Sequence, residues 1–164
     1  MTMPNVSLDK RPDVSAFLDA QSNTTSYVIK DPDSTSCAII DAVMQFDYAT
    51  GRLSYESADE IIDFITSNGL HLEWIIGTHV HAGHLSAPPY IQGRLGGKIG
   101  IGEYIQEVQD TFGKIFNEGT EFQRDGSQFD KLFKDGDLYK IASLECFAIH
   151  SPGPHTCMHG TCNG

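Results

Sequence analysis

The stretch Thr78-His79-Val80-His81-Ala82-Gly83-His84 places three imidazoles within six residues. It follows an apolar run, Leu72 to Ile76, that is typical of a buried strand. In a tight loop, His79 and His81 can point the same way, and His84 can return to the same point from the first turn of a helix. Because α/β folds place their sites in loops at the carboxyl ends of strands, we expect these histidines to line a functional site.

The three histidines have the chemistry of metal ligands. Neutral imidazole nitrogens bind zinc and ferrous iron well. A bound dication can lower the pKa of a water, polarise a substrate or bind dioxygen. The alternative is three surface histidines in a loop without chemistry, but the strand-to-helix setting favours the metal. We therefore predict one divalent metal near His79, His81 and His84.

The residues before this stretch predict a hairpin and a loop. Ser26 to Lys30 and Cys37 to Asp41 have the patterns of two strands, joined by the turn Asp31-Pro32-Asp33-Ser34. The opening segment, to about Asn23, is polar and poorly patterned. Phe46 to Ser54 is predicted as a loop. Asp41, at the end of a buried strand, has two interpretations, a site residue or a turn-capping carboxylate, and the second is favoured.

Helix and strand signals alternate through the rest of the chain. Ser57-Ala58-Asp59-Glu60 matches a capping box, with Ser57 as the cap and Glu60 reaching back, and Asn68-Gly69 ends that helix. The later predicted elements are a helix from His84 to Leu95 whose start Pro88-Pro89 can delay, a strand from Lys98 to Ile101, a helix from Glu103 to Phe112, and a hairpin of Asp137 to Ile141 and Leu144 to Ile149. This order is that of an α/β fold.

Composition limits the classes of partner. The 164 residues suit one domain, and 40% hydrophobic with 20% charged residues is typical of a globular protein. A formal charge of -11 repels phosphate backbones and anionic lipids, so we expect no nucleic acid and no membrane partner. No apolar run reaches the roughly 20 residues that span a bilayer.

The start of the chain and the cysteines predict a cytoplasmic protein. Residues 1–10 lack the basic-then-apolar layout of a secretory signal. We therefore interpret all four cysteines as reduced thiols, at positions 37, 146, 157 and 162.

Blocks of sequence along the chain resemble the metallo-β-lactamase superfamily, whose signature is His-x-His-x-Asp-His. The closest likeness is to the bacterial persulfide dioxygenases, relatives of the glyoxalase II hydrolases. The blocks that carry it include Cys37-Ala38-Ile39-Ile40-Asp41, His84-Leu85-Ser86-Ala87, Leu95-Gly96-Gly97-Lys98-Ile99, Asp125-Gly126-Ser127-Gln128-Phe129-Asp130 and Asp135-Gly136-Asp137.

This resemblance implies a fold and a reaction. The fold is α/β, the N-terminal portion of an αββα sandwich. The reaction is oxidation of glutathione persulfide by dioxygen to sulfite and glutathione, with iron(II) as the favoured metal and zinc as the alternative. In the persulfide dioxygenases, the iron is held by the first motif histidine, a later histidine after Pro-Gly and a distant aspartate. His79 and His155 are the counterparts of those two histidines.

Two departures from the family pattern affect the predicted site. Gly83 stands where the motif has an aspartate, which in dinuclear zinc hydrolases is a ligand of the second metal. Residues 151–158 read Ser-Pro-Gly-Pro-His-Thr-Cys-Met, where the family has Ser/Thr-Pro-Gly-His-Thr-Pro-Ala-Cys-Met. A slip of reading frame after Gly153 explains both the intruding Pro154 and the missing Pro-Ala pair.

The slip predicts a boundary within the chain. Residues 1–153 are expected to form a partial metallo-β-lactamase-fold domain and residues 154–164 an aberrant tail without order. The alternative for that tail is a zinc site of its own, formed by His155, Cys157, His159 and Cys162. The chain stops at Gly164, where the family enters the strand that carries its metal aspartate, so we expect a truncated product.

Three functions remain open from the sequence. The first is a persulfide dioxygenase. The second is a zinc-dependent hydrolase of a thioester, lactone or β-lactam, and the third is an inactive fragment that binds metal. The expected partners are a small-molecule thiol, persulfide or ester-type substrate. A sandwich cut at this point exposes a sheet edge, so self-association through that edge is expected as well.

Overall fold

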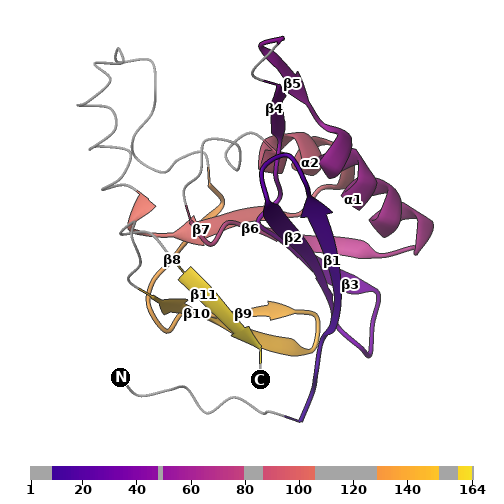
Figure 1. Ribbon diagram of the computed structural model, residues 1–164. Coiled ribbons are helices and arrows are strands. Elements are labelled where there is room, and N and C mark those ends of the chain that lie inside the picture. The colour runs from indigo at the N-terminus through magenta and orange to yellow at the C-terminus, as the bar shows by residue number, and fades with distance from the viewer. Residues whose placement is uncertain (1–8, 48–49, 80–86, 106–128, 152–158, 164) are drawn as a thin grey trace.

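A computed structural model describes residues 9–47, 50–79, 87–105, 129–151 and 159–163. Figure 1 shows a central sheet with two helices on one face and a smaller sheet on the other. The helices are α1 (Glu56–Ser67) and α2 (Ala87–Leu95). The strands are β1 (Asp13–Asp19), β2 (Thr24–Lys30), β3 (Ser36–Ile40), β4 (Gln45–Asp47), β5 (Arg52–Ser54), β6 (His71–Ile76), β7 (Lys98–Gly102), β8 (Lys131–Phe133), β9 (Leu138–Ile141), β10 (Leu144–His150) and β11 (His159–Asn163).

The central sheet has six strands in the order β1-β2-β3-β6-β7-β8. β1, β2 and β3 pair antiparallel, which confirms the predicted hairpin of β2 and β3. β3, β6, β7 and β8 pair parallel. The carboxyl ends of these parallel strands therefore meet at one edge of the sheet, where the loop after β6 carries the histidine stretch.

The central strands are buried on both faces because their side chains alternate between two cores. In β3, Cys37 and Ile39 pack in the core beneath the helices. Ala38 and Ile40 face the other way and pack against residues of β9 and β10. The three layers are therefore helices, six-stranded sheet and second sheet, as expected for the first part of an αββα sandwich.

The start of α1 differs from the predicted capping box. The helix begins at Glu56, so Ser57 lies inside its first turn and caps nothing. The N-cap is Tyr55, which makes no side-chain capping bond, while the Glu56 N–H donates to Ser54 Oγ at 3.3 Å. The capping-box prediction was wrong because the chain leaves β5 at Ser54 and enters the helix directly, so that the N-cap is Tyr55 and not Ser57.

The end of α1 is as predicted. Gly69 has a positive φ of 63°, its N–H donates to the Thr66 carbonyl at 3.1 Å, and the Leu70 N–H donates to the Ile65 carbonyl at 2.9 Å. This pair of bonds satisfies carbonyls that the helix leaves open, and only glycine adopts such a φ without steric cost.

Several strands were absent from the sequence prediction. β1 lies in the opening segment that was interpreted as poorly patterned, and β4 and β5 form a hairpin in the predicted loop 46–54. β8 was missed because three residues are too short for a periodic signal. Within the tail 154–164, for which no order was expected, β11 pairs antiparallel with β10, since an open strand edge satisfies backbone groups of a passing segment.

Two cysteines whose surroundings the structure describes, Cys37 and Cys146, are free thiols, as predicted. Cys37 and Cys146 are both fully buried. Burial raises the pKa of each thiol to about 12. No helix in the described part of the chain is both long and apolar enough to cross a membrane.

The buried carboxylate of Asp31 joins the two sheets. It lies in the turn between β2 and β3 and is fully inaccessible to solvent. From the β9–β10 turn it accepts bonds from the Ser143 backbone N–H at 3.0 Å and from Ser143 Oγ at 2.7 Å. Within its own turn it accepts from the Asp33 N–H at 3.2 Å and Ser34 Oγ at 3.1 Å. Burial alone raises the pKa of Asp31, but these bonds outweigh it and lower the pKa to about 2.

We expect Asp31→Asn to destabilise the fold by about 2 kcal/mol, because an amide cannot accept all the bonds that the charged group accepts. The lowered pKa means that this stabilisation is complete above the ordinary value of 3.8 and is lost as the pH falls towards about 2. Urea unfolding between those pH values measures it. Asp33→Asn is the matched control, since its side chain is 63% exposed. Equal losses in the two variants would contradict the assignment.

A second stability test concerns the contact between β7 and β8. A Cβ added to Gly100 would lie 2.5 Å from Cε2 of the buried Phe133. We expect Gly100→Ala to lower the free energy of unfolding by about 1–3 kcal/mol through overpacking. Gly93 in α2 has no atom within 4 Å of such a Cβ, so Gly93→Ala should be neutral or stabilising in the same unfolding measurement.

Candidate metal centre

The edge where β3 and β6 end carries the first elements of the predicted site. Asp41 follows β3, and its N–H donates to the Ile76 carbonyl at the end of β6 at 2.8 Å. Ser26 Oγ donates to the Asp41 carbonyl at 2.7 Å. These bonds hold Asp41 at a φ of 54°, a left-handed conformation that aspartate tolerates better than most residues. The backbone therefore leaves the strand direction at Asp41, and β3 ends there.

The carboxylate of Asp41 holds the start of the histidine stretch. Its Oδ1 accepts the Thr78 N–H at 2.7 Å, and its Oδ2 accepts the Thr78 hydroxyl at 2.6 Å. Thr78 Oγ1 lies 3.0 Å from Nδ1 of His79. A carboxylate, a hydroxyl and an imidazole therefore form one continuous hydrogen-bonded chain.

This chain assigns the tautomer of His79. The Thr78 hydroxyl has a single proton, which it donates to Asp41, so towards His79 it can only accept. Nδ1 of His79 must then carry the proton, and in the neutral ring Nε2 carries the lone pair that a metal needs. In metal sites, hydrogen bonds to the ring nitrogen that does not bind the metal orient the imidazole and raise its basicity.

Asp41 and Thr78 show where the sequence prediction was incomplete. Asp41 was favoured as a turn-capping carboxylate, and it does cap the turn at Thr78. Through Thr78 it is also connected to His79, so the interpretation of Asp41 as a site residue stays a prediction. The sequence analysis gave Thr78 no role. The signal for its role was its position directly before His79, at the end of a strand whose parallel neighbour ends in an acid.

The carboxyl ends of β7 and β10 lie close together. Tyr104 follows β7, His150 ends β10, and their ring centroids are 4.5 Å apart. The His150 N–H also donates to Asp135 Oδ1 at 2.8 Å. Because β7 is the parallel neighbour of β6, the end of β10, which precedes the predicted ligand His155, is on the His79 side of the sheet.

No protein-family model matches the sequence. The chain is 46% identical over 143 residues to a probable metallo-hydrolase from Burkholderia pseudomallei (strain 1710b), covering 87% of this chain and 48% of the relative. It is 41% identical over 145 residues to a β-lactamase hydrolase-like protein from Agrobacterium fabrum, covering 88% and 33%. It is 42% identical over 144 residues to Glyoxylase B2 from Dictyostelium discoideum, covering 87% and 49%.

Solved structures have the same fold. ETHE1 from Myxococcus xanthus matches with a TM-score of 0.66 and 18% identity, over 92% of this chain and 53% of that one. A metallo-β-lactamase from Staphylococcus aureus matches with a TM-score of 0.65 and 15% identity, over 92% and 36%. The chain has the fold of the metallo-β-lactamase superfamily. The predicted fold class is therefore confirmed.

The chain spans a third to a half of the length of the curated relatives it matches. The superfamily uses divalent metal ions. His79 is the first histidine of the stretch that resembles the superfamily's signature, and its role as a ligand stays a prediction. The remaining predicted ligands, His81, His84 and His155, lie outside the described residues.

The complete ligand set stays a prediction. Among the residues that the structure describes, no group of three or more His, Cys, Asp or Glu side chains is placed to hold a metal ion. For the alternative zinc site in the tail, His155 and Cys157 fall outside the described ranges, and of His159 and Cys162 only the backbone is described. Trp74 and Phe133 pack together in the core between the sheets.

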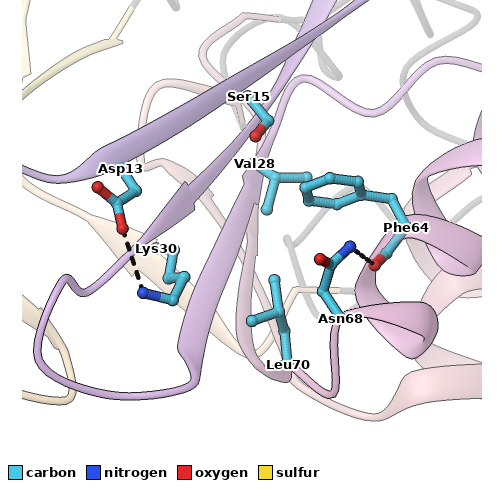
Figure 2. Close-up of a pocket in the computed structure, with 7 residues that line it drawn as sticks. All are labelled: Asp13, Ser15, Val28, Lys30, Phe64, Asn68 and Leu70. Carbon is cyan, nitrogen blue, oxygen red and sulfur yellow. Dashed lines mark hydrogen bonds and ion pairs between the residues drawn. The ribbon is translucent and has the colours of Figure 1, made fainter.

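A pocket of about 170 Å³ lies away from this edge (Figure 2). It opens between β1, β2 and the C-terminal end of α1, where Phe64, Val28 and Leu70 give it an apolar lining. At its rim Lys30 Nζ pairs with Asp13 Oδ2 at 3.2 Å, so its charges are already neutralised. It shares no residue with the Asp41–Thr78–His79 chain and is not part of the candidate metal centre.

The hydroxyl of Thr78 can be tested by its effect on metal affinity. We expect Thr78→Val to weaken zinc or ferrous iron binding by about 10–100-fold, because the imidazole loses the bond that fixes its tautomer. Thr78→Ser keeps the hydroxyl and should retain the affinity. Competition titration of the full chain with a chromophoric chelator measures both constants. Unchanged affinity in Thr78→Val would remove Thr78 from the site.

Proposed function

We propose that this chain carries the first ligands of a single iron(II) centre in a persulfide dioxygenase. Glutathione persulfide, dioxygen and water would give glutathione and sulfurous acid, so that the outer sulfur loses the electrons that dioxygen gains. The observation that carries this proposal is the Asp41–Thr78–His79 chain, in which the Thr78 hydroxyl contacts Nδ1 of His79 and so favours Nε2 as the nitrogen that would bind the metal. The sequence blocks shared with the persulfide dioxygenases and the fold of ETHE1 support it.

The donor set fits one metal better than two. His79 and His155 are the proposed ligands, and we propose that His81 and His84 contribute to the same site. Gly83 replaces the aspartate that binds the second metal in dinuclear zinc enzymes, so the chain lacks one carboxylate of a two-metal set. A bound iron(II) ion would supply a common centre for substrate sulfur and dioxygen, which makes oxygen transfer a process within one complex.

Asp41 and Thr78 have positioning roles in this proposal. Asp41 accepts both polar hydrogens of Thr78 and fixes the backbone at the start of the loop. Thr78 accepts the Nδ1 proton of His79 and keeps it away from the metal side of the ring. Side chains held in this way retain a productive geometry without reorganising when a metal binds.

A zinc-dependent hydrolase is the second candidate. The curated relatives bear the names of a metallo-hydrolase, a β-lactamase hydrolase-like protein and a glyoxylase, and these names favour hydrolysis. Such an enzyme would cleave a thioester, lactone or β-lactam with water activated by zinc. The same Asp41–Thr78–His79 chain would serve it, so the choice between the two functions depends on the metal and on oxygen use.

The metal and the reaction can be measured together on the purified full chain. We expect bound iron and, once the part of the fold that carries the family's metal aspartate is supplied, oxygen uptake that depends on glutathione persulfide. His79→Ala should abolish iron binding and lower oxygen uptake by at least about 100-fold, because a metal ligand is lost. His71→Ala is the control. His71 is exposed at the start of β6, the strand that precedes His79, so its substitution should change neither quantity.

The other outcomes each exclude the dioxygenase. Zinc content with ester or thioester hydrolysis and no oxygen uptake would assign the hydrolase. Metal bound through His79 with neither activity would assign an inactive metal-binding fragment, and equal effects of His79→Ala and His71→Ala would remove His79 from the site.

A further inference from the structure

The last residue of β10, His150, is held from two adjacent strands of the six-stranded sheet. Its ring lies against the ring of Tyr104, which follows β7, with the centroids 4.5 Å apart and the planes inclined at 37°. Its backbone N–H donates to Oδ1 of Asp135 at 2.8 Å, and Asp135 follows β8, which ends at Phe133. The side chain and the backbone of one residue are therefore fixed by the neighbouring sheet.

The turn after β8 extends this hold along β10. The Gly136 N–H donates to the Ala148 carbonyl at 2.7 Å, and the Ala148 N–H donates to the Asp137 carbonyl at 2.9 Å. Oδ2 of Asp137 closes the turn by accepting the Lys134 N–H at 2.9 Å. The segment that leaves the six-stranded sheet at β8 is thus bonded to the last three residues of β10.

The other end of β10 is held by a separate contact. Ser143, directly before β10, donates to the Asp31 carboxylate through its N–H at 3.0 Å and its hydroxyl at 2.7 Å. Asp31 precedes β3, whereas Asp41 of the candidate metal centre follows it. The Asp31–Ser143 contact and the candidate metal centre therefore lie at opposite edges of the six-stranded sheet, and His150 is at the end of β10 away from Asp31.

The contact between Tyr104 and His150 lies where the two sheets approach the proposed ligands. β6 and β7 pair in parallel, so His79 and Tyr104 leave the six-stranded sheet at the same edge. In the second sheet, the chain runs from His150 into residues 151–155, and His155 is the other proposed ligand. The proposed centre therefore takes one ligand after a strand of each sheet.

We propose that Tyr104 is a positioning residue of the metal centre. Its ring, packed on His150, sets the separation between the strand ends from which His79 and His155 come. This inference rests on the proposed function, because that separation matters only to a centre with a ligand from each sheet. Ligands must be held within about 0.5 Å of their productive geometry. Removing the ring leaves a gap that the two strand ends close only by moving.

Zinc affinity of the full chain tests the inference with a metal that has no redox chemistry, by competition with a chromophoric chelator. We expect Tyr104→Ala to weaken zinc binding about tenfold or more, the loss typical for a residue that orients metal ligands. Tyr104→Phe keeps the ring contact and should retain the affinity. Ser143→Ala is the matched control, because it removes the hydroxyl bond to Asp31 at the other end of β10. It should lower the resistance to urea and leave the zinc affinity unchanged.

Hydrogen exchange of the metal-free chain measures the same contact without a ligand. Tyr104→Ala should speed exchange of the His150 amide, because the end of β10 opens more often. Ser143→Ala should leave the exchange of that amide unchanged. Exchange of the His150 amide that Tyr104→Ala does not alter would mean that the ring contact does not hold the strand end, which overturns the inference.

The zinc titrations separate this inference from the proposed function. Unchanged affinity in Tyr104→Ala, with binding still abolished by His79→Ala, would overturn the positioning role alone. Affinity that is indifferent to His79→Ala would remove the proposed centre and this inference with it. Equal weakening by Tyr104→Ala and Ser143→Ala would assign the loss to general instability, and a Tyr104→Phe variant as weak as Tyr104→Ala would exclude the ring contact. Circular dichroism checks folding, and Tyr104→Leu repeats the test if Tyr104→Ala does not fold.

Discussion

The two hydrogen bonds from Thr78 to the Asp41 carboxylate are the constraint on which the candidate site depends. They join the ends of two adjacent parallel strands that are remote in sequence, so the position of His79 is set by the sheet and not by its loop alone. The strained φ of Asp41 is supported by the bond from its N–H to Ile76 and by the bond from Ser26 to its carbonyl. Such strain persists only where the surrounding structure holds it, and it is common next to functional groups.

The parts of the fold that the sequence predicted are those with strong local signals. The apolar runs of β3 and β6 and the Asn68-Gly69 helix end each depend on neighbouring residues, so pattern alone identified them. β1 was missed because its pairing with β2 stabilises a segment whose polar residues hide the alternation. The capping box failed because the chain enters α1 from β5, and tertiary context overrode a local preference. Tautomer control by Thr78 required two strands to be placed side by side, which no single-sequence pattern provides.

The second sheet is attached to the first by two different interactions. Trp74, Phe133 and Tyr139 fill the space between the sheets with ring contacts of 5.1–5.9 Å between centroids. At one end Asp31 adds a charged group that accepts bonds across the gap from Ser143. Apolar packing gives this interface its strength, whereas the buried carboxylate fixes its register.

The burial of Cys37 and Cys146 has a consequence for the proposed persulfide chemistry. Persulfides and oxidants react with thiolates, and the rate depends on the thiolate fraction and on access. With a pKa of about 12 and no exposed surface, both thiols stay protonated and out of reach at neutral pH. The scaffold would thus be spared sulfur exchange and overoxidation, so that a substrate persulfide is not consumed by the protein that binds it.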